Sequence, residues 1–136
     1  MPALRDYRIF ISHAWTYNDH YHKLVEWFDG APLFKWFDHS VPEHDPLPPG
    51  SNKRLSDALH RQIQGCHCVV VMGGMYVNHR EWIQHEIDIA RRFQKPIIAV
   101  RPLGAVVLPK ALTDVAHEVV SWRQVAVVDA IRRHAL

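Results

Sequence analysis

Cys66-His67-Cys68-Val69-Val70-Val71-Met72 is an almost continuous apolar run, and Gly73-Gly74 follows it directly. A strand that is covered on both faces has this pattern, because neither side of it meets water. The two glycines indicate the end of the strand, since glycine turns the chain at little steric cost. We therefore expect a central strand of a parallel sheet over residues 66–72.

Strand-like and helix-like segments alternate on both sides of this run. Period-2 or fully apolar stretches predict four more strands, at residues 7–12, 33–37, 96–100 and 118–122. Period-3.6 stretches predict helices at residues 17–29, 52–64, 81–93 and 125–134, with a short helical turn at 110–114. In the last helix we expect Val125, Val128 and Ile131 to face inward.

This alternation predicts an α/β fold, in which a five-stranded parallel sheet carries helices on both faces. Five strands in a chain of 136 residues favour the flavodoxin-like order 2-1-3-4-5. Ligands of such sheets bind beyond the carboxyl ends of the strands, where the strand order reverses. Here that crevice is predicted between the segments Ser12-His13-Ala14-Trp15 and Gly73-Gly74-Met75-Tyr76.

The composition narrows the classes of function. A length of 136 residues is enough for one domain and too short for two, so we expect a single domain over residues 1–136. Hydrophobic residues make up 48% of the chain and charged residues 22%, which is typical of a folded globular protein. Acidic and basic residues are intermixed at a net charge of +2, which argues against a nucleic-acid partner. The first residues lack the apolar core of a signal peptide, and no run is long enough to span a bilayer, so we expect no membrane contact and a cytoplasmic location.

Trp82 and Glu86 stand out within the predicted helix at 81–93. Four residues apart, their side chains lie one turn apart on the same helix face. A flat ligand could stack on the indole and meet the carboxylate. The alternatives are that Trp82 packs beneath the preceding loop and that Glu86 is an ordinary exposed carboxylate.

A family resemblance rests on three features. Phe10-Ile11-Ser12-His13 ends the first strand, a loop opening with Phe37-Asp38 follows the second, and Trp82-x-x-x-Glu86 follows the third. Together they resemble the Toll/interleukin-1 receptor (TIR) domain, and most closely the short prokaryotic TIR-like proteins that include the TIR component of the Thoeris antiphage system. The resemblance covers residues 8–101.

The resemblance implies cleavage of NAD+ between nicotinamide and ribose, with Glu86 as the catalytic residue. NAD+ would be the substrate, with no resident cofactor. The product would be ADP-ribose or an isomer of cyclic ADP-ribose, and it would signal to a separate effector in antiphage defence. Self-association through TIR surfaces is also implied. The alternative is a non-catalytic TIR module that only binds other proteins.

Further substrate contacts are expected around the crevice, at Phe10, Ser12, His13, Asp38, Ser40 and Trp82. Asp38 and Ser40 could bond ribose hydroxyls or simply begin a surface loop at 38–50 that its prolines stiffen. Phe10 could border the site or belong to the core. The eleven histidines lack the spacing of metal ligands, so we expect no metal. Cys66 and Cys68 are predicted to be buried thiols.

Overall fold

The strands form one parallel sheet. The computed structural model describes residues 5–12, 19–40, 53–73, 80–102 and 108–136, and the side chains of residues 53–56, 80 and 82 lie outside this description. Within these ranges the strand order is β2-β1-β3-β4-β5. The strands are β1 (Asp6–Ser12), β2 (Lys35–Asp38), β3 (Cys68–Met72), β4 (Ile97–Val100) and β5 (Glu118–Val120). The predicted fold class and strand order are confirmed.

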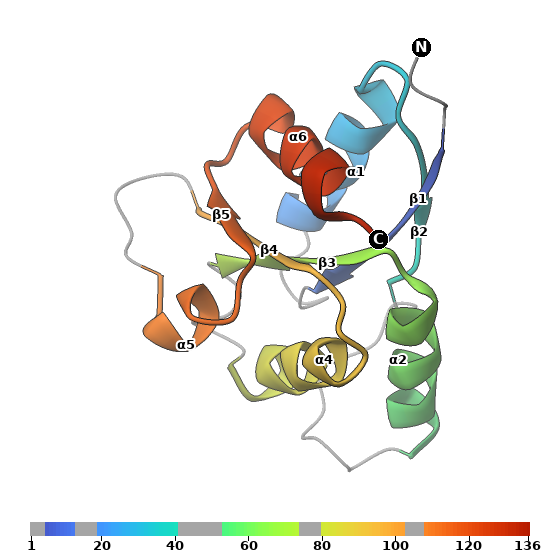
Figure 1. Ribbon diagram of the computed structural model, residues 1–136, viewed down its shortest axis with the longest axis vertical. Coiled ribbons are helices and arrows are strands. Elements are labelled where there is room, and N and C mark those ends of the chain that lie inside the picture. The colour runs from blue at the N-terminus through green and yellow to red at the C-terminus, as the bar shows by residue number, and fades with distance from the viewer. Residues whose placement is uncertain (1–4, 13–18, 41–52, 74–79, 103–107) are drawn as a thin grey trace.

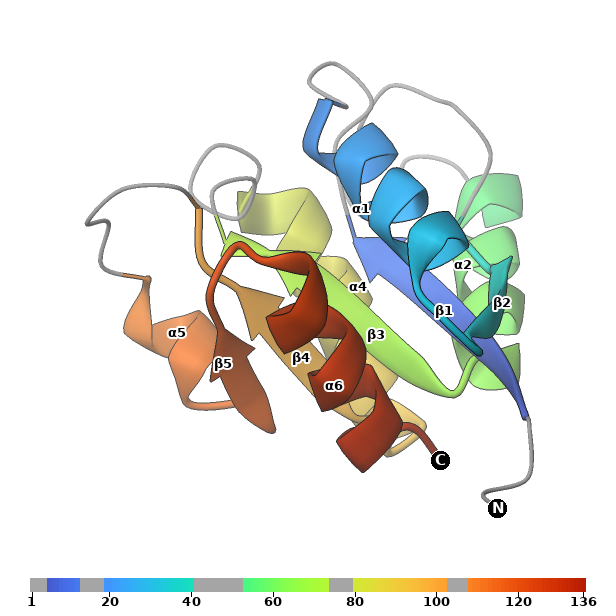
Figure 2. The ribbon, with the colours of Figure 1, turned by 90° about the horizontal axis from the view of Figure 1, so that it is seen from above.

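Helices cover both faces of this sheet. Helices α1 (Asp19–Gly30) and α6 (Gln124–His134) pack on one face, and α2 (Lys53–Gly65) and α4 (Arg80–Arg92) pack on the other (Figure 1). The short helix α5 (Lys110–Thr113) lies near β5 in both views (Figures 1 and 2). None of the described helices combines the length and the apolar character that a membrane span requires.

Strand β3 lies at the centre of the core. All its residues are buried, and it pairs with β1 on one side and β4 on the other. The apolar run predicted this burial, because a strand between two helix layers has no solvent-facing side. Cys66 and Cys68 are buried free thiols, as the sequence indicates.

The second strand begins later than predicted. Leu33 has a φ of 55° and a side chain that is 74% exposed, so it lies in a turn rather than in the sheet. Phe34 then inserts into the core, where its ring stacks on Tyr7 at 4.8 Å between centroids. An apolar triplet can thus contain one exposed turn residue, which periodicity does not reveal.

Two histidines extend the strand ladder with their side chains. The His67 N–H donates to the Arg8 carbonyl at 2.7 Å, while Nδ1 of His67 accepts the Arg8 N–H at 2.9 Å. In the same way, the His117 N–H donates to the Ile97 carbonyl at 2.7 Å, and Nδ1 of His117 accepts the Ile97 N–H at 3.0 Å. Each imidazole replaces a backbone partner just before a strand begins, so β3 starts at Cys68 instead of residue 66. Burial, followed by the nearby Arg8 charge, lowers the pKa of His67 and favours this accepting, neutral form.

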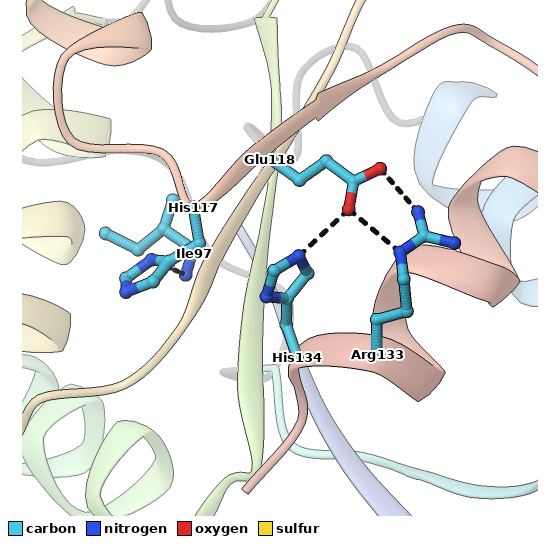
Figure 3. Close-up of polar contacts among 5 residues, drawn as sticks. All are labelled: Ile97, His117, Glu118, Arg133 and His134. Carbon is cyan, nitrogen blue, oxygen red and sulfur yellow. Dashed lines mark hydrogen bonds and ion pairs between the residues drawn. The ribbon is translucent and has the colours of Figure 1, made fainter.

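The edge strand β5 is tied to helix α6 by charge. Arg133 Nε donates to Glu118 Oε1 at 3.1 Å, and His134 Nε2 lies 2.9 Å from the same oxygen (Figure 3). The Arg133 hydrogen bond contributes most to lowering the pKa of Glu118. These contacts, with the His117 ladder bond beside them, anchor a strand of only three residues.

The C-terminal prediction was wrong in two details. Val125 is 67% exposed, because the buried stripe of α6 consists of Val127, Val128, Ala130 and Ile131 and does not include Val125. The predicted strand at 118–122 ends two residues early, since Trp122 turns out of the sheet to pack against Trp27, with 4.7 Å between ring centroids.

Gly73 allows the ends of β3 and β4 to approach each other closely. A Cβ at this position would lie 2.2 Å from Leu108 Cδ2 and 3.1 Å from the Val100 carbonyl oxygen. Such contacts require the side chain of Leu108 and the backbone of β4 to shift. Gly30, by contrast, has room for a Cβ, with its nearest contact at 3.6 Å.

We expect Gly73→Ala to lower the free energy of unfolding by about 1–3 kcal/mol, because overpacking strains a dense core. Urea unfolding followed by circular dichroism measures the change. Gly30→Ala is the control and should be neutral or slightly stabilising, since alanine is favoured over glycine in helices. Equal stability of Gly73→Ala and the wild type would show that this approach is not tight.

Candidate functional site

Ser12 and Glu86 form a buried polar pair at the carboxyl end of the sheet. Ser12 is the last residue of β1, and its Oγ donates a hydrogen bond of 2.8 Å to Oε1 of Glu86. Ser12 is 0% exposed and Glu86 3%. The bond joins two segments that are distant in sequence, at the point where the strand order reverses between β1 and β3. The topology predicted a site here.

Helix α4 places Glu86 on its apolar face. Ile83 and Ala90, one turn before and one turn after Glu86, are buried, and so is the adjacent Ile87. A carboxylate in such a stripe is uncommon, because acidic side chains rarely lie fully inside a protein unless they are paired. The reading of Glu86 as an ordinary exposed carboxylate is therefore wrong.

Burial changes the acidity of this carboxyl group. Loss of solvent raises the pKa of Glu86 to about 8, and the hydrogen bond from Ser12 opposes part of that rise. At neutral pH most molecules therefore hold Glu86 in its neutral form. A nearby positive charge would favour ionisation, so the group is poised to respond to a cationic ligand.

Asp38 and Ser40 meet the end of β1 from the neighbouring strand. Asp38 ends β2 and accepts the Ser40 N–H at 2.8 Å. The Ser40 hydroxyl accepts the Ile11 N–H at 3.1 Å and lies 3.4 Å from the Ile11 carbonyl, to which it can donate. Ser40 thus contacts the residue that precedes Ser12, whereas Asp38 pairs with Ile9, three residues before Ser12 on β1. Their predicted contact with ribose stays a prediction.

The other predicted site residues differ in what the structure shows of them. Phe10 is 1% exposed and belongs to the hydrophobic core, which favours packing as its role. His13 lies outside the described residues, as do residues 41–50 of the predicted loop. Trp82 lies in the first turn of α4, but its side chain lies outside the description, so its two readings stay open.

Tyr21 is a neighbour of the site that the sequence did not indicate. Tyr21 lies in α1, and its partly buried side chain packs against the core. Its hydroxyl donates a hydrogen bond to Asp38 at the end of β2. The polar tip of an inward tyrosine needs a partner, and that requirement is the only sequence signal that points to this contact.

Comparison with known proteins adds a family and a fold. Residues 10–106 match the family described as the TIR-like domain of the Thoeris protein ThsB. A search of curated proteins gives no match. The fold is similar to that of Clostridium botulinum CMP N-glycosidase, BcmB, at a TM-score of 0.56 and 15% identity over 93% of this chain and 99% of that one. It is also similar to a 2-deoxyribosyltransferase from Bacillus psychrosaccharolyticus, at a TM-score of 0.55 and 13% identity over 85% of each chain.

The raised pKa of Glu86 predicts how stability depends on pH. The pKa of the Glu86 carboxyl group is 4.5 in the unfolded state and about 8 in the folded state. Between these pH values the unfolded state is ionised while the folded state is still protonated, so the free energy of unfolding of the wild type falls as the pH rises. Glutamine does not titrate, so Glu86→Gln should lack this loss. Going from pH 5 to pH 8, we expect the unfolding free energy of the variant to rise relative to that of the wild type by on the order of 1–3 kcal/mol.

Urea unfolding of both proteins at the two pH values measures this difference, and any constant effect of the amide cancels. Glu81→Gln is the control, because Glu81 is exposed on the same helix and should change the difference little. A gap between wild type and Glu86→Gln that is the same at both pH values would contradict a raised pKa.

Proposed function

Since the chain belongs to the TIR-like domain family of the Thoeris protein ThsB, we propose that it cleaves the bond between nicotinamide and ribose in NAD+. Glu86 is the catalytic residue of this proposal. The observation that carries it is the buried hydrogen bond between Ser12 and Glu86 at the carboxyl edge of the sheet. Burying a carboxyl group there costs stability, which is a common mark of a functional residue.

The proposed reaction suits one buried carboxyl group. As the glycosidic bond breaks, its electron pair moves to the nicotinamide nitrogen, so the leaving group departs neutral and needs no proton. Positive charge builds on the ribose ring in an oxocarbenium-like transition state, as in glycoside hydrolysis. An ionised Glu86 stabilises that charge in surroundings of low dielectric constant, where the attraction is strong.

The positive charge of the substrate favours the ionised form of Glu86. Free protein holds Glu86 mostly protonated at pH 7, because its pKa is about 8. The nicotinamide ring of NAD+ is cationic, and an opposite charge nearby lowers the pKa of a carboxyl group. Binding therefore releases a proton to solvent and creates the carboxylate that the reaction needs.

The proposed product is a form of cyclic ADP-ribose that acts as a signal in antiphage defence. A hydroxyl or ring nitrogen of the adenosine half attacks the ribose carbon and loses a proton, whereas attack by water gives ADP-ribose. Folding the substrate so that its own atoms reach the carbon before water does favours cyclisation. Stacking on Trp82 would assist that folding. A separate effector would respond to the product.

A second candidate is hydrolysis of a nucleoside or nucleotide that has an uncharged base. The two structural neighbours are named as an N-glycosidase for CMP and a 2-deoxyribosyltransferase, and the fold they share with this chain is compatible with that chemistry. An uncharged base leaves poorly unless it is protonated, and the neutral form of Glu86 is a suitable general acid. The non-catalytic interaction module is less favoured, because docking does not require a buried carboxyl group.

The pH dependence of turnover separates these candidates. For NAD+ we expect kcat/KM to rise with pH to a plateau, with a midpoint near 8, because kcat/KM reports the ionisation of the free enzyme. A general acid would give the opposite trend, with activity lost above pH 8. Chromatography of released nicotinamide measures the rate, and mass spectrometry distinguishes ADP-ribose from cyclic ADP-ribose, which is lighter by one molecule of water.

Glu86→Gln tests the assignment of the catalytic residue. We expect turnover of NAD+ to fall by at least about 100-fold, the order of loss seen when one electrostatic partner of a transition state is removed. Glu81→Gln is the matched control on the same helix and should keep wild-type turnover, since its side chain is exposed. Equal rates for Glu86→Gln and wild type would exclude Glu86 from the chemistry. Cleavage of CMP but not NAD+ would support the second candidate.

A further inference from the structure

Tyr21, Asp38 and Ser40 form a continuous set of hydrogen bonds from helix α1 to strand β1. The Tyr21 hydroxyl donates to Oδ2 of Asp38, and the other carboxylate oxygen, Oδ1, accepts the Ser40 N–H at 2.8 Å. Ser40 Oγ in turn contacts both backbone groups of Ile11, at 3.1 Å from the nitrogen and 3.4 Å from the oxygen. Three elements, α1, β2 and β1, are thereby joined beside the site.

Ser40 continues the sheet beyond the point where β2 ends. The β1–β2 ladder has its last paired residues at Ile9 and Asp38, and the His39 N–H then donates to the Ile9 carbonyl at 2.8 Å. Backbone groups two residues apart point to the same neighbouring strand, so those of Ile11 face the continuation of β2. The Ser40 hydroxyl occupies this place. It holds the end of β1 by contacts with both the N–H and the carbonyl of Ile11.

What holds Ile11 also orients Ser12, the next residue. The Ser12 side chain is fully buried and its hydroxyl must point at Glu86 to make the 2.8 Å bond. A rotation of the backbone at Ile11 would move that hydroxyl, because adjacent residues share a planar peptide unit. The hydrogen bonds from Tyr21 to Ile11 therefore end on the residue that sets the direction of Ser12.

We propose that Tyr21 is a positioning residue for the reaction at Glu86, acting through Asp38 and Ser40 to hold the end of β1 so that the Ser12 hydroxyl stays on the carboxyl group. This inference rests on the proposed cleavage of a glycosidic bond. It also gives Asp38 and Ser40 a role other than the ribose contact that the sequence suggested, since their polar atoms already hold the strand end.

Tyr21 keeps its proton over the pH range of such a reaction. Burial, the hydrogen bond to Asp38 and the negative charge of that residue all raise the pKa of Tyr21 above its ordinary value of 10.0. The hydroxyl is therefore a permanent donor. For Glu86, burial and the Ser12 hydroxyl are the two influences on the pKa within the described residues. A change at Tyr21 should thus reach Glu86 through Ser12.

Tyr21→Phe tests this by removing one hydroxyl while keeping the ring. Titration of the Glu86 carboxyl carbon by NMR, without substrate, should show a pKa raised by about 0.3–1 unit, because the opposing Ser12 bond weakens. The Ile11 amide should exchange its hydrogen faster. In turnover of NAD+, the pH–rate profile should move to higher pH, so the rate falls at pH 7 and recovers at pH 9. A merely structural role would lower activity at every pH equally.

Tyr7→Phe is the matched control, because it also removes one tyrosine hydroxyl. Tyr7 lies near the start of β1, at the opposite end from Ile11 and Ser12, and its ring stacks on Phe34. It should leave the Glu86 pKa and the Ile11 exchange unchanged. Ser40→Ala removes the hydroxyl that contacts Ile11 and should reproduce the changes expected for Tyr21→Phe. This variant also tests the proposal if Tyr21→Phe fails to fold. Identical titration and exchange in these variants and in the wild type would overturn the proposal.

Failure of the proposed function would be seen separately. If wild-type protein cleaves neither NAD+ nor CMP, the assigned reaction is wrong, but the titration of Glu86 and the exchange of Ile11 still decide whether Tyr21 holds the pair in place. The opposite result is also distinguishable. If the wild type cleaves NAD+ but Tyr21→Phe and Ser40→Ala leave the Glu86 pKa and the Ile11 exchange rate unchanged, the reaction stands and Tyr21 has no part in it.

Discussion

The hydrogen bond between Ser12 and Glu86 joins the end of a central strand to a helix inside an otherwise apolar layer. Among the residues that the structure describes, the other fully buried side chains are apolar and need no hydrogen-bond partner, whereas this pair needs a defined mutual position. A carboxyl group at 3% exposure loses its hydration, and one hydroxyl only partly replaces it. The protein therefore holds a group whose ionisation is unfavourable until something positive approaches it.

Several features of the fold supply that position. Order 2-1-3-4-5 makes β1 and β3 neighbours with diverging connections, so the end of β1 and the helix after β3 meet at one edge. Gly73 lets β3 and β4 close together there. On the other side, Ser40 continues the ladder with its hydroxyl, as His67 and His117 do with imidazoles at the opposite ends of the strands. Side chains thus complete the sheet where backbone partners are missing.

The sequence predicted the elements that long-range packing reinforces and missed details that depend on a single contact. Continuous apolar runs such as 68–72 and strict helical stripes have one structural solution, and those elements were correct. Leu33 and Val125 were misplaced because apolar residues at element ends can face solvent without large cost. Glu86 could have been recognised as buried, since it interrupts the stripe of Ile83 and Ala90. Tyr21 could not, because its partner comes from another part of the chain.

Ionisation of Glu86 on binding of a cation is the central claim. NMR titration of the Glu86 carboxyl carbon, with and without a non-cleavable NAD+ analogue that keeps the cationic nicotinamide ring, tests it most directly. A pKa near 8 in the free protein, falling below 7 in the complex, is the predicted result. A pKa near 4.5 in the free protein, or one that stays at 8 when the analogue is bound, would contradict the account.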